Sequence, residues 1–113
     1  MITIYHNPRC SKSRQGLAIL EESGKEFKVV KYLDTPLSEA EISEIISKLG
    51  ILAEELVRKN EAVWKENYKG KQLNEGQIVS AMAQHPKLIE RPIVVKGAKA
   101  VLGRPPENIH GIL

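Results

Sequence analysis

The sequence predicts an α/β domain whose mixed four-stranded sheet is interrupted by a helical insert. Alternating apolar residues over 2–5, a helical pattern after residue 11 and a second apolar run over 27–33 give the order strand–helix–strand. Such a βαβ unit implies parallel strands and a right-handed crossover. Residues 91–102 return to strand character, and the stretch between, about 37–90, is mostly helical in pattern. The chain therefore combines a βαβ half, a helical insert and a ββα half.

Helix signals mark the first two helices clearly. We expect the first helix from about Ser11 to Ser23, with Gly24 supplying the left-handed residue that ends it. Ser38 and Glu41 form the S-x-x-E pattern of a capping box. Apolar residues then follow at helical spacing until Gly50, which predicts a helix with one apolar face.

The rest of the insert and the second half of the sheet have weaker signals. A short helix is expected to end near residues 58–60, and Asn74 with Gln77 resembles a second capping pair, before a helix that Pro86 stops. Residues 91–95 and 99–102 predict a hairpin. A short helical turn follows it. This is the element order of a thioredoxin-like fold with helices added between its two halves.

Size and composition are those of one globular domain over residues 1–113. The chain has a formal net charge of +3, 42% hydrophobic residues and 27% charged residues. One Phe, one Trp and three Tyr give little stacking surface for a nucleic acid, so no nucleic-acid partner is expected. The three histidines and the single cysteine lack paired spacing for a metal, so we expect no metal site. No long apolar run indicates a membrane partner, and a cytoplasmic monomer is the expectation.

Cys10, the only cysteine, is the strongest candidate for chemistry. A lone cysteine is commonly a small buried hydrophobe, but its neighbours here are Pro, Arg, Ser and Lys, which are not core residues. Cys10 lies where a strand ends and a helix begins. Backbone N–H groups and the positive end of the helix dipole stabilise a thiolate at that position. We therefore predict a nucleophile in an anion-attracting loop.

The motifs of the chain resemble those of the glutaredoxin-coupled arsenate reductases of bacteria, in particular a short subgroup of them. The resemblance covers the chain from Ile2 to its C-terminus. It rests on five motifs: His6-Asn7-Pro8-x-Cys10-x-x-Ser13-Arg14, Arg58-Lys59-Asn60, His85-Pro86-x-Leu88-Ile89, Glu90-Arg91-Pro92-Ile93-Val94-Val95 and Arg104-Pro105. Arg9 and Lys12 depart from the best-known members, which tend to have a small residue directly before the cysteine.

The resemblance implies a role for each matching residue. Cys10 would attack arsenate, and Arg58, Arg91 and Arg104 would hold the oxyanion, a role that suits the forked guanidinium group. Three further residues would poise the thiolate: His6, Asn7 and Ser13. Pro92 is the candidate for the cis-proline that faces the cysteine in thioredoxin-type sites.

The implied reaction uses thiols from other molecules. No bound cofactor is expected; glutathione would be the co-substrate and glutaredoxin the reductant, in agreement with a chain whose one cysteine cannot form an internal disulfide. Two alternatives stay open. One is a glutathione-linked thiol oxidoreductase acting on another substrate. The other is a polymerase-binding regulator like the Spx family, although Ser13 stands where those regulators usually have a second cysteine.

Overall fold

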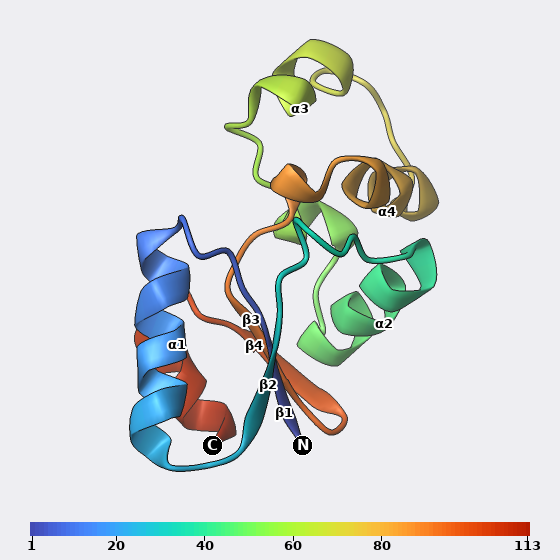
Figure 1. Cartoon of the computed structure of the whole chain (residues 1–113). Coiled ribbons are helices and arrows are strands. Elements are labelled where there is room, and N and C mark those ends of the chain that lie inside the picture. Colours follow the sequence, from blue (N-terminus) through green and yellow to red (C-terminus); the bar gives the residue numbers. More distant parts are fainter. The chain divides into compact units, whose positions relative to one another are not determined.

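The computed structural model describes all 113 residues and divides into two compact units (Figure 1). Residues 1–35 and 91–113 form the first, here called the sheet unit, and residues 36–90 form the second, here called the helical unit. The limits of the helical unit differ by one residue from those of the helical insert expected over about 37–90. None of the helices has the length and apolar composition needed to cross a bilayer.

The sheet unit has a four-stranded mixed sheet in the order β2-β1-β3-β4. β1 pairs in parallel with β2 and antiparallel with β3, and β3 pairs antiparallel with β4. The predicted thioredoxin-like α/β fold class is therefore confirmed. The elements of this unit are β1 (Ile2–Tyr5), α1 (Ser11–Ser23), β2 (Phe27–Val30), β3 (Ile93–Lys96), β4 (Lys99–Leu102) and the 3₁₀ helix η3 (Pro106–Ile112).

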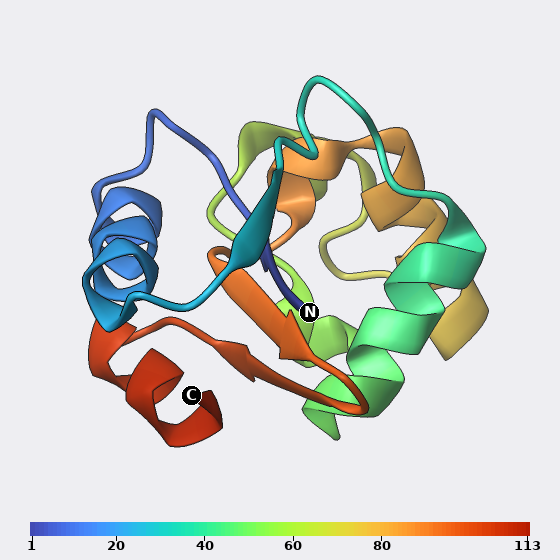
Figure 2. The same ribbon diagram turned by 60° about the horizontal axis from the view of Figure 1, so that its bottom comes forward.

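One core joins the sheet to the two helices of this unit. α1 and η3 lie beside each other against the same face of the sheet, as Figure 2 shows. Burial of apolar surface at about 25 cal/mol per Å² is what holds them there. The buried members of the core are Ile2, Ile4, Leu20, Val94, Ile109 and Ile112.

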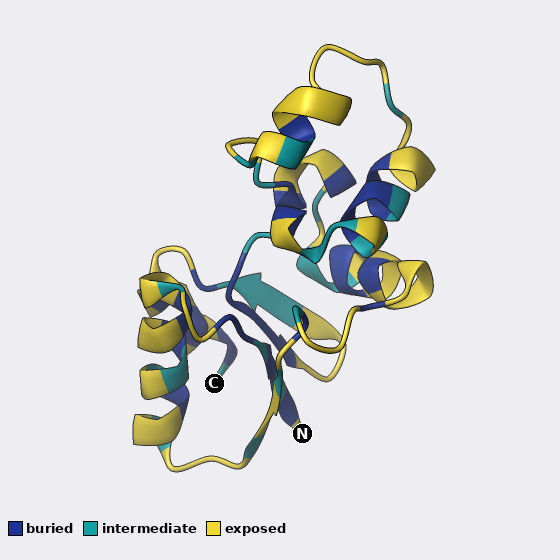
Figure 3. Cartoon of the chain, turned by 45° about the horizontal axis from the view of Figure 1, so that its top comes forward, coloured by how far each residue is buried: buried dark blue, intermediate teal, exposed yellow.

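The helical unit is built on two capped helices. Its elements are α2 (Glu39–Leu49), η1 (Ala53–Leu56), α3 (Ala62–Asn67), α4 (Glu75–Gln84) and η2 (Pro86–Leu88). Both predicted capping boxes form: the Ser38 hydroxyl accepts from the Glu41 N–H at 3.1 Å, and the Asn74 side chain accepts from the Gln77 N–H at 2.8 Å. Each of these helices buries one face and exposes the other, the alternation of dark and yellow in Figure 3.

Two strands are shorter than the sequence predicts. β2 ends at Val30 rather than continuing to residue 33, because the Lys31 carbonyl accepts hydrogen bonds from Asp34 and Thr35 at 3.0 Å and so starts a turn. β3 begins at Ile93 rather than at residue 91, since Pro92 has no N–H to donate to a neighbouring strand. The short helix expected before residues 58–60 is the 3₁₀ helix η1.

The Arg91–Pro92 peptide bond is cis, as is the Arg104–Pro105 bond. The ring of Pro92 lies against two glycines, Gly16 of α1 and Gly103 at the end of β4. A Cβ on Gly103 would lie 2.7 Å from Pro92 Cγ, and one on Gly16 would lie 2.9 Å from the same atom. Since a proline ring has little freedom to move aside, these two positions require glycine.

We therefore expect Gly103→Ala to destabilise the protein by about 1–3 kcal/mol, the usual range for overpacking. Urea denaturation followed by circular dichroism measures this change in the free energy of unfolding. Gly111→Ala is the matched control, because a Cβ on Gly111 meets no atom within 4 Å. Equal stabilities of the two variants would show that contact with Pro92 does not restrict position 103.

Candidate active site

Cys10 lies in the loop that joins β1 to α1, and it is the N-cap residue of that helix. Its backbone is extended, with φ −97° and ψ 124°, so the helix begins only after it. The cysteine is half-buried, whereas its neighbours Arg9 and Ser11 are exposed. The sulfur is thus accessible, at the end of the helix that carries the partial positive charge of the dipole.

Backbone hydrogen bonds fix the shape of this loop. The Cys10 N–H donates to the Asn7 carbonyl at 3.0 Å, and the Arg9 N–H donates to Asn7 Oδ1 at the same distance. Arg14 Nη1 reaches back from α1 and donates to the Pro8 carbonyl at 3.0 Å. The loop is therefore tied both to itself and to the helix that follows it.

The Ser13 hydroxyl is the buried centre of the loop. Its Oγ accepts from the Asn7 N–H at 2.9 Å and lies 2.6 Å from His6 Nδ1. All three side chains are buried, with Ser13 fully so. The Ser13 hydroxyl has one hydrogen and two lone pairs, so it can accept from Asn7 and also either donate to Nδ1 or accept from it, according to the imidazole tautomer.

The surroundings of His6 favour its neutral form. Burial lowers the pKa of His6, and the charges of Lys31 and Arg14 lower it further, while hydrogen bonding to Ser13 acts in the opposite direction. The net pKa lies below the ordinary value of 6.5, so the imidazole is uncharged at pH 7. His6 accordingly acts on this loop as a neutral hydrogen-bonding partner of Ser13.

The thiol of Cys10 is shifted toward its thiolate form. Burial, the largest influence, raises the pKa, but the backbone N–H groups of Ser13 and Lys12 and the guanidinium of Arg91 together lower it below the ordinary value. The side chain of Cys10 makes no capping hydrogen bond to the helix. His6 is absent from the groups that lower this pKa. Ser13 acts on the sulfur through its backbone and on the loop through its hydroxyl.

Arg91 is the cation that the structure places beside Cys10. Its residue is only 8% exposed, it forms no ion pair, and its buried Nε has no hydrogen-bond partner. A buried donor without a partner is costly, by about 1–3 kcal/mol. This cost suits a residue whose partner is a ligand: an anion beside the sulfur would satisfy Nε and neutralise the guanidinium.

Arg104 lies in the same unit as Arg91, just after the adjacent strand. The Gly103 N–H donates to the Pro92 carbonyl at 2.8 Å, which extends the β3–β4 ladder by one pair beyond Ile93 and Leu102. Arg91 and Arg104 are each the next residue beyond this bond. The side chain of Arg104 is exposed at that edge of the sheet.

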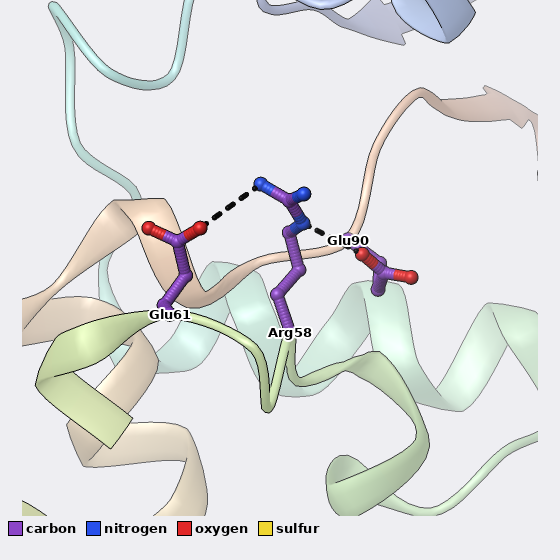
Figure 4. Close-up of polar contacts among 3 residues, drawn as sticks. All are labelled: Arg58, Glu61 and Glu90. Atoms are coloured by element: carbon purple, nitrogen blue, oxygen red, sulfur yellow. Dashed lines mark hydrogen bonds and ion pairs between the residues drawn. The ribbon is translucent and has the colours of Figure 1, made fainter. Parts of the chain in front are cut away.

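Arg58 belongs to the helical unit and is held there by two carboxylates. An isolated bridge pairs Val57 with Ile89, and this pairing brings the segments of Arg58 and Glu90 together. Arg58 Nε lies 3.1 Å from Glu90 Oε1, and Nη1 lies 3.3 Å from Glu61 Oε2 (Figure 4). Three of its five N–H groups are not used by these carboxylates, so the guanidinium is oriented and retains donors.

The structure thus brings together most of the residues that the sequence singled out, within the sheet unit. His6, Asn7 and Ser13 form one buried network, and Cys10 with Arg91 lies beside it. The sequence did not indicate the carboxylates on Arg58. Glu90 adjoins Arg91 in the chain, but the pairing across the bridge from Val57 to Ile89 has no sequence signal. The structure shows no group of three or more His, Cys, Asp or Glu side chains that is placed to hold a metal ion.

Comparison with known proteins identifies the family. The model of the ArsC family matches residues 5–112. An arsenate reductase of Neisseria meningitidis (strain Z2491) is 46% identical over 114 residues, covering 99% of this chain and 97% of the relative. An arsenate reductase of Escherichia coli is 42% identical over 99% of this chain, which spans 80% of that relative.

A solved structure shows the same fold. The arsenate reductase from Vibrio cholerae superposes with a TM-score of 0.95 at 46% identity, covering 99% of this chain and 97% of that one. The family model, the full-length relatives and the fold agree: this chain belongs to the ArsC family.

Proposed function

We propose that the protein is an arsenate reductase in which Cys10 attacks the oxyanion. The observation that carries the proposal is the pairing of a thiol of lowered pKa with a buried arginine whose Nε has no protein partner. Arsenate is a tetrahedral oxyanion. The names of the relatives at 42–46% identity support this choice of substrate.

The proposed chemistry begins with the Cys10 thiolate. Attack of the sulfur on arsenic and loss of one oxygen as water forms a sulfur–arsenic bond. Repulsion between a thiolate and an anion opposes this step, and guanidinium groups offset it through forked, charge-assisted hydrogen bonds. The closeness of Arg91 to the sulfur supports this role for it. We assign the same role, contacts with the oxyanion and its adduct, to Arg104 and Arg58.

Two electrons must then come from outside thiols, because the chain has one cysteine. In the proposed sequence glutathione adds to the arsenic and a second water leaves. A glutaredoxin thiolate then attacks the glutathione sulfur, and the pair of electrons from the broken sulfur–arsenic bond reduces arsenic(V) to arsenic(III). Hydrolysis of the remaining bond to Cys10 releases arsenite and regenerates the thiol.

The direct test supplies arsenate, glutathione and glutaredoxin and follows the formation of arsenite. We expect turnover by the wild-type protein and a loss of at least about a hundredfold in Cys10→Ser, because a hydroxyl is not ionised near neutral pH. Circular dichroism checks that the variant is folded. Absence of arsenite above the Cys10→Ser background would contradict the proposal. Reduction of a glutathione disulfide without arsenate turnover would favour a thiol oxidoreductase instead.

The second prediction concerns the thiol pKa. Arg91→Gln removes a positive charge beside the sulfur, so the pKa of Cys10 should rise. The pH dependence of alkylation by iodoacetamide measures this pKa. Lys96→Gln, which removes an exposed charge at the other end of β3, should leave it unchanged. An unchanged midpoint in Arg91→Gln would show that this arginine does not stabilise the thiolate.

The third prediction separates the arginines by their surroundings. Arg58→Ala should lower kcat/KM for arsenate by about tenfold, and Arg91→Ala by about a hundredfold, since two carboxylates already share the Arg58 charge and none pairs with Arg91. Lys59→Ala is the control. It removes the neighbouring charge, which is paired with Glu54 at 2.6 Å. If Arg58→Ala and Lys59→Ala have equal kinetics, Arg58 has no part in oxyanion binding.

A further inference from the structure

We propose that the two carboxylates on Arg58 act on oxyanion binding in opposite directions. Glu90 is a positioning residue that fixes the guanidinium, whereas Glu61 is a competing anion that the oxyanion displaces. The inference rests on the proposed function, in which Arg58 contacts the oxyanion and its adduct. It adds to that site a positioning residue and a competitor, both of which lie with Arg58 in the helical unit.

The charge of this cluster does not attract an anion by itself. Arg58 carries one positive charge and the two glutamates carry two negative charges, so the three side chains together have a formal net charge of −1. The side chains of Arg58, Glu61 and Glu90 are only 23%, 28% and 25% exposed, so water and salt screen these charges incompletely. An oxyanion therefore gains from the Arg58 charge only when one of the carboxylates moves away.

The two carboxylates bind different nitrogens of the guanidinium. An arginine presents two forks to an oxyanion, one between Nε and the neighbouring Nη and one between the two Nη nitrogens. Glu90 Oε1 lies 3.1 Å from Nε and so closes the first fork. Glu61 Oε2 lies 3.3 Å from Nη1, on the opposite side of the group in Figure 4, and contacts one nitrogen of the fork that remains. An oxyanion that binds both Nη nitrogens therefore competes with Glu61.

Glu90 is held beside Arg58 by the backbone. The Glu90 N–H donates to the Leu56 carbonyl at 2.8 Å, and the Arg58 N–H donates to the Leu88 carbonyl at 2.7 Å, on either side of the isolated bridge between these two segments. Both residues that flank Glu90 in the chain are buried. The carboxylate therefore has little freedom to leave Arg58, and its contact with Nε fixes the plane of the guanidinium.

Glu61 has the freedom that Glu90 lacks. It follows Arg58 by three residues and is the N-cap of α3, a helix of six residues. Its side chain accepts no hydrogen bond from that helix, so rotation of the side chain breaks only the contact with Nη1. The residues on either side, Asn60 and Ala62, are exposed. Rotation therefore carries the carboxylate into water and leaves Nη1 to the oxyanion.

The experiment measures the dissociation constant of arsenate by isothermal titration calorimetry, with Cys10→Ser in every protein so that no sulfur–arsenic bond forms. Glu61→Gln should bind arsenate about threefold more tightly, because it removes the competing charge and keeps the size of the side chain. Glu90→Ala should bind about fivefold more weakly, since the freed guanidinium can then turn both nitrogens of a fork toward Glu61. Glu90→Gln should recover this loss, because its amide oxygen still accepts from Nε.

The same substitutions in an Arg58→Ala background separate this role from a general effect of charge or stability. Residues that act through a shared partner lose their effect when that partner is removed, so each change should alter the affinity there by less than about 1.5-fold. The Nε–H resonance of Arg58 in isotope-labelled protein reports the orientation of the guanidinium independently of affinity. It should persist in Glu61→Gln and under saturating arsenate, and should be lost through exchange with water in Glu90→Ala.

Each variant has a matched control in the helical unit. Glu66→Gln removes an exposed charge from α3 and is the control for Glu61→Gln. Glu54→Ala removes the ion pair with Lys59 and is the control for Glu90→Ala. Both controls should bind arsenate with the affinity of the parent protein.

The outcomes distinguish this inference from the proposed function. Weaker binding by Glu61→Gln, or changes in affinity that persist in the Arg58→Ala background, would overturn the inference and leave the proposed function intact. Glu90→Gln as weak as Glu90→Ala would show that an acceptor on Nε does not position Arg58. Absence of arsenate binding by the parent protein would contradict the proposed function together with this inference.

Discussion

The hydrogen bonds of the Ser13 hydroxyl are the constraint on which the Cys10 loop depends. Oγ lies in the first turn of α1 and binds both His6 and the backbone of Asn7, the two residues that leave β1. A buried hydroxyl without these partners would cost about 1–3 kcal/mol. The same contacts therefore fix the start of α1 relative to the end of β1, and they thereby fix the position of Cys10 as the N-cap.

The surroundings of the thiol follow from this N-cap position. Because Cys10 is the N-cap, the amides of Lys12 and Ser13 are free to act on the sulfur, which replaces the oxygen of an ordinary cap. Burial alone would make the thiol less acidic. Amide dipoles and the Arg91 guanidinium outweigh it, so the reactive form is produced by the geometry of the fold and needs no charged histidine.

The sequence predicted the elements more fully than the contacts between them. Capping boxes at Ser38 and Asn74 and glycine at the end of α1 are local signals, and the helices that they mark were predicted nearly to the residue. The strand beginning at Phe27 was predicted too long, since its end depends on a turn at Lys31 that periodicity does not record. The ion pairs of Arg58 depend on a bridge between segments about thirty residues apart, which no local pattern indicates.

Arg58 and Arg91 show how the surroundings of an arginine decide whether its charge is already compensated within the protein. Arg58 has a carboxylate on two of its nitrogens, so much of its charge is already compensated and its orientation is fixed before any ligand arrives. Arg91 is buried, its Nε has no hydrogen-bond partner and no carboxylate pairs with it, so the Cys10 thiolate is the anion that shares its field. A lysine would keep the charge at position 91 but lose the fork that contacts both groups at once. Under the proposed function, arginine is required there because its fork would contact two anions, the sulfur of Cys10 and an oxygen of the substrate.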